Sequence, residues 1–332
     1  MQNNRSKLRS GETAGAVYPP PPSGVVLSLV APCYNEQDTI PLFYEELCAA
    51  VKAMERFGVS AEFIFIDDGS TDETPKIIEA LSEKDDRVHY AIFSRNFGKE
   101  AAMLAGLQTA SGDFIAMLDA DLQHPPDLLP SMFEALKDGE YDCAGTIRTR
   151  KGDSKLRSAL SRAFYRLINK LSDMEFIDGA GDFRLMSRQY VDAVLSLSER
   201  NRFSKGIFQW IGFRTKWFHY ENRSRAAGDT KWSFRKLFLY SLDGVVAFSS
   251  KLLAIASILG ITLFVLSICA VIFIVVRKLM FGDPVQGWAS TVCIVLFCAG
   301  VQLLTTGVLG EYLAKTYNEV KRRPHFVIRK QK

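Results

Sequence analysis

The chain has 332 residues, of which 48% are hydrophobic and 23% are charged, and its formal net charge is +4. This composition excludes collagen-like and disordered chains, and so small a net charge argues against a nucleic-acid-binding protein. The 6 cysteines form no CxxC pair and have no histidine nearby, which argues against a disulfide scaffold or a zinc site and suits a reducing compartment.

Residues 1–24 are polar and end in the proline run 19–22, so we expect a flexible or extended leader rather than a signal peptide. Beyond them, short apolar runs alternate with helical patterns, which predicts a parallel sheet with helices on both faces. The predicted strands are 25–31, 62–66, 88–93, 114–118 and 141–146, and the predicted helices are 39–56, 99–111, 126–137 and one that begins at a capping box of Ser70 and Glu73.

Polar residues follow the carboxyl ends of these strands, the edge at which open α/β sheets bind ligands. They are Asn35, Glu36, Asp67, Asp68, Arg95, Asp119, Asp121 and Arg148. Each cluster alone is also compatible with an ordinary turn, but five clusters on one edge indicate a site. Neither the glycine-rich dinucleotide motif nor the P-loop motif occurs, so a nicotinamide enzyme or a P-loop enzyme is not supported.

The residue types at this edge suit a nucleotide diphosphate. Asp119 and Asp121 can hold Mg²⁺ or Mn²⁺, which neutralises a diphosphate leaving group, and Gln123 can add a carbonyl ligand or bind a metal water. Arg148 and Arg150 offer the guanidinium fork that binds phosphate oxygens.

Two basic amphipathic segments precede the C-terminal apolar runs. The pattern of 154–171 fits a helix on an anionic membrane surface and fits equally a core-facing helix with a solvated basic face. For 232–240 the interfacial interpretation is favoured, because this segment directly precedes the apolar runs.

Residues 252–276 and 284–310 carry no formal charge and are apolar all round, which predicts two transmembrane helices rather than buried core helices. The short link 277–283 makes them an antiparallel hairpin. Because the basic residues concentrate in the two long flanks, we expect both flanks and both termini in the cytoplasm and a multi-pass protein of the inner membrane. The expected organisation is a leader (1–24), a soluble domain (25–230), an interfacial segment (231–250), two spans at about 252–276 and 287–310 within 251–313, and a basic tail (314–332).

Four motifs together carry a family resemblance: Ala31-Pro-Cys-Tyr-Asn-Glu-Gln, Ile66-Asp-Asp-Gly-Ser-Thr-Asp, Arg95-Asn-Phe-Gly-Lys and Asp119-Ala-Asp-Leu-Gln. From Val25 to its C-terminus the chain resembles the inverting glycosyltransferases of family 2, and within them the polyprenyl-phosphate glycosyltransferases, especially bactoprenol glucosyltransferases. It is also related to dolichol-phosphate mannose synthases. The resemblance implies the GT-A fold, which is a Rossmann-like α/β domain with a mostly parallel sheet, followed by interfacial helices and a transmembrane hairpin.

The resemblance also implies the roles of the strand-end residues. The nucleotide-sugar group comprises Pro32, Tyr34, Asn35, Glu36, Asp67, Asp68, Arg95, Lys99, Asp119 and Arg148, and the metal group comprises Asp119, Asp121 and Gln123. The expected cofactor is Mg²⁺ or Mn²⁺.

The glycine-rich segment 178–184 lies beside the donor sugar in the resembling proteins. Asp182 is the first candidate for a catalytic carboxylate and Asp178 the second. Mannose synthases generally have a serine-glycine pair in place of Gly181 and Asp182, which argues against GDP-mannose as the donor. Because a phosphate acceptor is already largely ionised at neutral pH, the carboxylate would orient the acceptor or stabilise positive charge on the sugar rather than act as a strong base. The residues expected at the acceptor phosphate are Arg150, Arg184, Arg202, Lys205 and Lys231. Solvated surface charge is the alternative for Arg202, Lys205 and Lys231, and the phosphate role is favoured for Arg202 and Lys231.

The leading hypothesis is therefore transfer of a hexose, with glucose favoured, from a UDP-sugar to undecaprenyl phosphate at the cytoplasmic face of the bilayer. The lipid-linked sugar would serve later glycosylation of a cell-surface glycan or lipid. The alternatives are the same chemistry with N-acetylglucosamine, amino-arabinose or mannose, and a non-catalytic membrane scaffold with a transferase-like domain. A processive polysaccharide synthase is disfavoured, because the Q-x-x-R-W motif is absent. Whether copies of the chain associate is left open.

Overall fold

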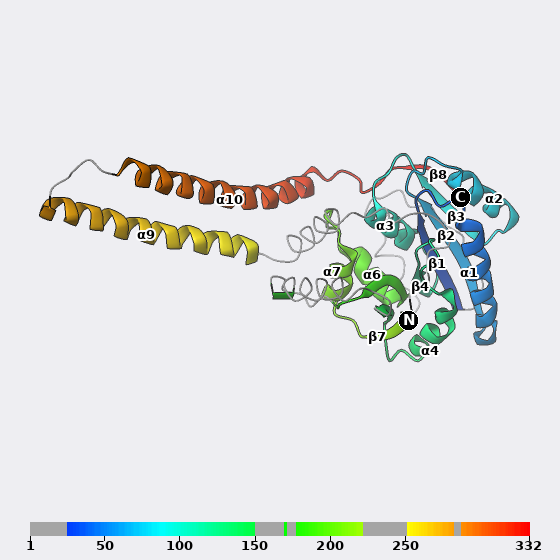
Figure 1. Ribbon diagram of the computed structural model, residues 1–332. Helices are drawn as coiled ribbons and strands as arrows, with labels where there is room; N and C mark the ends of the chain where they lie inside the picture. Colours follow the sequence, from blue (N-terminus) through cyan, green and yellow to red (C-terminus); the bar gives the residue numbers. More distant parts are fainter. Residues whose placement is uncertain (1–24, 150–168, 171–176, 222–250, 282–286) are drawn as a thin grey trace.

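The computed structural model describes residues 25–149, 169–170, 177–221, 251–281 and 287–332. They form an α/β domain and two long helices that run side by side away from it (Figure 1). The expected leader, Arg150, most of the amphipathic segment 154–171 and the whole interfacial segment 231–250 lie outside the described residues.

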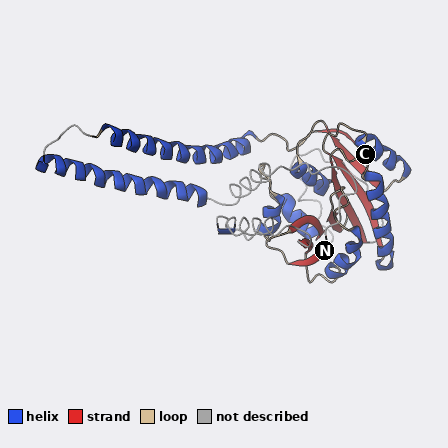
Figure 2. Ribbon diagram, viewed as in Figure 1, coloured by secondary structure: helices blue, strands red, loops and turns tan. Residues whose placement is uncertain are grey.

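The first half of the domain is a Rossmann-like β-α unit. Its elements are β1 (Val25–Cys33), α1 (Ile40–Met54), η1 (Glu55–Phe57), β2 (Val59–Asp67), α2 (Thr74–Lys84), β3 (Val88–Phe93), α3 (Lys99–Thr109), β4 (Phe114–Met117), η2 (Pro126–Leu128) and α4 (Leu129–Leu136). Strands β3, β2, β1 and β4 are neighbours in that order and all pair in parallel. These strands confirm the predicted parallel sheet, and Figure 2 shows helices on both sides of it.

One helix start was predicted wrongly. The capping box placed the start of α2 at Ser70, but the helix begins at Thr74, with Pro75 in its first turn. The backbone N–H of Thr74 donates to Asp72 Oδ1 (3.0 Å). Ser70 Oγ instead accepts the backbone N–H of Asn35 (2.8 Å), so the serine joins two strand-end loops rather than starting a helix.

The second half of the domain makes the sheet mixed. Its elements are β5 (Cys143–Thr149), β6 (Ala180–Ser187), α6 (Arg188–Ser196), α7 (Ser204–Trp210) and β7 (Thr215–Glu221). Strand β6 lies between β4 and β5 and is antiparallel to both, while β7 is parallel to β5. No strand was predicted at 180–187, because Gly181 and the charged residues Asp182 and Arg184 interrupt the alternation of apolar and polar residues. Yet Phe183 and Leu185 are fully buried on one side of the sheet and Met186 on the other.

The expected membrane hairpin corresponds to α9 (Lys251–Phe281) and α10 (Trp288–Lys321). Both helices are long and apolar enough to cross a membrane, and their large apolar side chains, such as those of Leu279 and Leu303, are exposed. The second helix does not stop near residue 310, where the predicted span ends, but continues to Lys321.

The end of the chain is part of the sheet rather than only a basic tail. After α10 the chain returns to the domain and forms β8 (Ile328–Gln331), which pairs antiparallel with β3 (Figure 1). The ring of Phe326 stacks on that of Phe93, with centroids 4.8 Å apart. Without β8, strand β3 would be an open sheet edge, so this pairing covers backbone groups that would otherwise be exposed.

Candidate active site

The loops after β1 and β2 are tied together at the carboxyl edge of the sheet. Asn35 adopts a left-handed backbone conformation (φ 54°), and its Oδ1 accepts the backbone N–H of Thr71 (2.9 Å). Glu36, next in the chain, donates its own N–H to Thr74 Oγ1 (2.8 Å). These contacts hold the predicted nucleotide-binding loop in one conformation, in which the Tyr34 side chain is exposed.

Asp68 joins the β2 loop to the β3 loop. Its carboxylate is buried and accepts the backbone N–H groups of Phe97 (2.7 Å) and Gly98 (3.0 Å). Burial raises the pKa of Asp68, and these two amides partly offset the rise. Gly69 (φ 68°) lies so close to this loop that an added Cβ would be 2.4 Å from the carbonyl carbon of Arg95. A side chain at position 69 would therefore push the two loops apart.

The remaining residues of the predicted nucleotide group lie along the same edge. Pro32 is near the end of β1, opposite Ile66 of β2, and Asp67 ends β2 fully buried. The backbone N–H of Ser70 donates to Asp67 Oδ2 (3.1 Å). The guanidinium of Arg95 stacks 4.0 Å from the ring centroid of Phe97.

Lys99 connects the ends of two strands. Its Nζ lies 2.7 Å from Asp119 Oδ1, after β4, and 2.6 Å from Asp182 Oδ2, near the start of β6. Desolvation alone would lower the pKa of Lys99 and raise that of Asp182. The ion pairs outweigh it, so the pKa of Lys99 lies above and that of Asp182 below its usual value. Asp182 is therefore ionised and Lys99 is charged at neutral pH.

The predicted metal group lies beside this ion-pair cluster. Asp121 Oδ1 accepts the backbone N–H of Gln123 (3.1 Å), and Leu122 between them has a left-handed backbone (φ 60°). Among the described residues no group of three or more His, Cys, Asp or Glu side chains could hold a metal ion. Mg²⁺, however, is commonly bound through one or two carboxylates and the phosphates of its substrate. Asp119 and Asp121 fit such a cation when a diphosphate supplies the other oxygens.

Two aromatic side chains that the sequence analysis did not assign to the site lie next to these carboxylates. His124 and Tyr220 are buried, with ring centroids 5.8 Å apart, and His124 Nδ1 is 3.8 Å from Asp119 Oδ2. Burial raises the pKa of Tyr220 to about 12, and Asp119, Asp121 and Asp182 add to the rise. The position of His124 just after the Asp-x-Asp-x-Gln motif could have indicated that this histidine belongs to the site. Nothing in the sequence around Tyr220 gave such an indication.

The predicted acceptor residues have different surroundings. The guanidinium of Arg184 is buried and stacks against Phe208 (4.3 Å to the ring centroid), and within the described part of the chain its Nε has no hydrogen-bond partner. Arg202 donates to the carbonyl of Leu197 (2.7 Å) at the end of α6. Lys205 is close enough to Asp182 to help lower the pKa of that carboxylate. Of these three residues, Lys205 and Arg184 act as positive charges on Asp182.

Arg148 lies at the end of β5, and Asp178 lies just before β6. The backbone N–H of Arg148 donates to the carbonyl of Gly179 (3.0 Å), which has a positive φ of 80°. The Arg148 side chain is exposed at the sheet edge. Arg150 and Lys231 lie outside the described residues, so their roles stay predictions.

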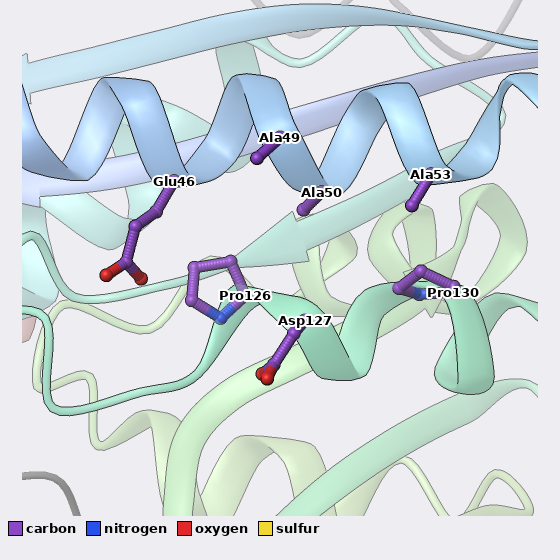
Figure 3. Close-up of a pocket in the computed structure, with 7 residues that line it drawn as sticks. All are labelled: Glu46, Ala49, Ala50, Ala53, Pro126, Asp127 and Pro130. Atoms are coloured by element: carbon purple, nitrogen blue, oxygen red, sulfur yellow. The ribbon is translucent and has the colours of Figure 1, made fainter.

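A cavity elsewhere in the domain does not coincide with this cluster. It lies between α1 and the η2–α4 segment (Figure 3), and none of the residues discussed above lines it. Its lining residues are Glu46, Ala49, Ala50, Ala53, Pro126, Asp127 and Pro130.

Comparisons with known proteins show the family of the chain. A family model described as glycosyl transferase family 2 matches residues 28–195. The chain is similar to the glycosyltransferase CsbB of Bacillus subtilis (strain 168), with 46% identity over 304 residues that cover 92% of this chain and 91% of the relative. It is also similar to the bactoprenol glucosyl transferase of Shigella phage SfII, with 39% identity over 304 residues that cover 92% of this chain and 97% of the relative.

Among solved structures, the chain matches glucosyl-3-phosphoglycerate synthase from Mycobacterium tuberculosis in complex with Mn²⁺, UDP-glucose and phosphoglyceric acid. The TM-score is 0.42 and the identity 19%, over 67% of this chain and 78% of that chain.

Proposed function

Because the chain belongs to glycosyl transferase family 2, we propose that it transfers a hexose, with glucose favoured, from a UDP-sugar to a polyprenyl phosphate of the bactoprenol type. Proteins named bactoprenol glucosyl transferase, from Shigella phages SfII and SfV, are similar to 92% of this chain and match 97% and 99% of their own length. The product would be a lipid-linked sugar for later glycosylation of a cell-surface glycan or lipid.

The single observation that carries this proposal is the Lys99 bridge at the end of the sheet. It brings Asp119, which follows β4, and Asp182 of β6 to within ion-pair distance of one ammonium group. The same chain carries two helices that are long and apolar enough to cross a membrane, which suits an acceptor dissolved in the bilayer.

On the donor side, the loops that carry Tyr34, Glu36 and Asp68 would bind the nucleotide, and Asp119, Asp121 and Gln123 would hold Mg²⁺ or Mn²⁺ with the diphosphate. The bound cation would neutralise charge on the departing UDP. Arg148, exposed at the same edge, is suited to a phosphate oxygen by its guanidinium fork.

On the acceptor side, the charge state of Asp182 decides which role this carboxylate can have. A phosphate oxygen of the lipid would attack the anomeric carbon from the face opposite UDP, so that one C–O bond forms as the other breaks and the configuration inverts. Since Lys99 holds the pKa of Asp182 below its usual value, this carboxylate is a poor proton acceptor. It would orient the cations that bind the acceptor, Lys205 among them, or stabilise positive charge on the sugar.

The topology expected from the basic flanks completes the proposal. With both ends of the α9–α10 hairpin on the cytoplasmic side, the domain faces the cytoplasm, where nucleotide sugars are available. The enzyme would then be a multi-pass protein of the inner membrane with its catalytic domain and both termini inside.

The direct test is transfer by the purified full chain in detergent, with polyprenyl phosphate, Mg²⁺ or Mn²⁺ and a panel of UDP-sugars, read out as lipid-linked sugar by mass spectrometry. We expect product with UDP-glucose. Product with another sugar alone would reassign the donor, and UDP binding without product from any donor would favour the scaffold.

A further inference from the structure

Lys99 occupies the position that a cation shared by the two carboxylates would need. Its Nζ is within 2.7 Å of Asp119 Oδ1 and 2.6 Å of Asp182 Oδ2, and no other described lysine or arginine side chain forms an ion pair with both. Asp119 is also one of the two residues proposed to hold the metal. A divalent ion that reached Asp119 from solution would therefore meet an ammonium group already in contact with that carboxylate.

The charges around the cluster oppose such an ion further. Lys205 and Arg184 both act on Asp182 as positive charges. Three acidic groups, Asp119, Asp121 and Asp182, all act on the nearby hydroxyl of Tyr220 and so lie in one neighbourhood. Without Lys99, Asp119 and Asp182 would lose the ammonium group that contacts them both, and their carboxylate oxygens are the ligands that Mg²⁺ and Mn²⁺ prefer. With Lys99 present, the local charge is close to balanced.

Binding of a nucleotide would change the charge balance around Asp119 and Asp182. A diphosphate brings its own negative charge and oxygen ligands, so a metal that arrives together with UDP does not need every protein carboxylate that a free metal would need.

We propose that Lys99 is a resident counter-cation that excludes free divalent metal from Asp119 and Asp182, and so makes metal binding depend on the nucleotide. Lys99 is thus a positioning residue that acts through the two carboxylates it holds. The inference rests on the proposed function, because it takes Asp119 and Asp121 as the metal ligands.

The experiment measures Mn²⁺ binding to the purified full chain by electron paramagnetic resonance, in which free Mn²⁺ gives the signal, with and without UDP. Without UDP, we expect Lys99→Met to bind Mn²⁺ at least about tenfold more tightly than the unmodified protein. Lys99→Gln, measured in parallel, should show the same gain, and Lys99→Arg should behave like the unmodified protein because it keeps the charge.

Two controls locate the effect. Lys137→Met removes another partly exposed lysine, paired with Glu134 (3.6 Å), and should leave Mn²⁺ binding unchanged. The double variant Lys99→Met with Asp182→Asn should lose the gain, because one of the freed carboxylates is gone. All variants are compared by thermal unfolding, so that a misfolded protein is recognised.

Equal Mn²⁺ affinity of the unmodified protein and both neutral Lys99 variants without UDP would overturn the inference. That result differs from failure of the proposed function, which would appear as absence of Mn²⁺-dependent UDP binding in the unmodified protein.

Discussion

The Asp182 carboxylate is held by an ion pair with Lys99. It lies near the start of β6 and reaches Lys99 of α3 at 2.6 Å. The neighbouring Glu100 contacts a different element: its half-buried carboxylate accepts the backbone N–H of Ser204 (3.1 Å) and the Ser204 hydroxyl, at the start of α7. Adjacent residues of α3 therefore hold β6 on one side and α7, which carries Lys205, on the other.

We expect Asp182→Asn to lower turnover by about 10²-fold or more, since the amide has the same shape but lacks the charge that acts on the reacting groups. UDP affinity should change little, because the nucleotide contacts lie on other loops. Steady-state kinetics and UDP titration check this. The control is Asp192→Asn, an exposed carboxylate on α6 that is paired with Arg188 (3.7 Å). A loss of UDP affinity as large as the loss of turnover would contradict the prediction.

Asp85 illustrates a charge that contributes to stability rather than to the site. Its carboxylate accepts hydrogen bonds from Arg87 Nη2 (2.7 Å) and Tyr44 Oη (2.5 Å). The hydrogen bonds with Arg87 hold the pKa of Asp85 well below its usual range. A carboxyl group whose pKa is depressed on folding stabilises the protein above its unfolded pKa of about 3.9 and loses that contribution as the pH falls below it.

The thermal unfolding midpoint of the unmodified protein should therefore exceed that of Asp85→Asn at neutral pH. The difference should shrink as the pH falls below about 4. Midpoints of the two proteins measured across this pH range test the assignment. A difference that stayed constant with pH would show that Asp85 acts through shape alone.

At the scale of elements, β8 is the feature that most changes the interpretation of the chain. Backbone hydrogen bonds run both ways between Tyr90 and Lys332, and Lys330 forms an ion pair with Glu79 (2.8 Å). Phe326 packs into the apolar cluster on one face of the sheet. The chain therefore forms most of the domain, leaves it for the two long apolar helices and returns to complete the sheet.

We expect Phe326→Ala to lower the free energy of unfolding by about 2 kcal/mol, since it removes a partly buried ring and its stacking on Phe93. Chemical denaturation of the full chain in detergent, followed by fluorescence, provides the measurement. Arg329→Ala changes an exposed side chain of the same strand and should shift stability by less than about 0.5 kcal/mol. Equal effects of the two substitutions would mean that β8 is held by its backbone alone.

At the scale of the whole molecule, the end of α10 contacts the loop that leads into α7. Glu319 Oε2 accepts the backbone N–H of Arg200 (2.9 Å), and Lys315 Nζ donates to Asn201 Oδ1 (3.1 Å). The loop continues to Ser204, which Glu100 holds. The helix α10, which is long and apolar enough to cross a membrane, is thus connected through one short loop to α7, the helix that carries Lys205.

Glu319→Ala should raise the apparent KM for the lipid acceptor by about 2- to 10-fold, equivalent to one hydrogen bond of about 0.5–1.5 kcal/mol. UDP affinity should not change, because the donor loops make no contact with α10 among the interactions described. Acceptor titrations at saturating donor measure the effect. Glu311→Ala removes another carboxylate of α10 and serves as the control. An unchanged KM in Glu319→Ala would show that this contact does not position the residues proposed to bind the lipid acceptor.

Much of the fold and part of the site could be predicted without coordinates. The four parallel strands were predicted because continuous apolar runs followed by polar turns indicate buried strands. The placement of Asp119 and Asp121 at a strand end followed directly. Arg184 shows the limit, because an arginine near a predicted site is expected to face a ligand, whereas the fold buries its guanidinium against Phe208.

Local order can thus be predicted from the amino-acid sequence: alternating strands and helices, polar residues at the strand ends, two apolar helices, and the family to which these motifs belong. Hydrophobic period and motif spacing are properties of neighbouring residues, so they can be interpreted along the chain. Three features follow only from packing in three dimensions: β6 inserts antiparallel between β4 and β5, β8 returns to cover β3, and Lys99 joins Asp119 to Asp182. These are contacts between distant segments, chosen by which strand edge remains unpaired and which charges must be balanced once the core has packed.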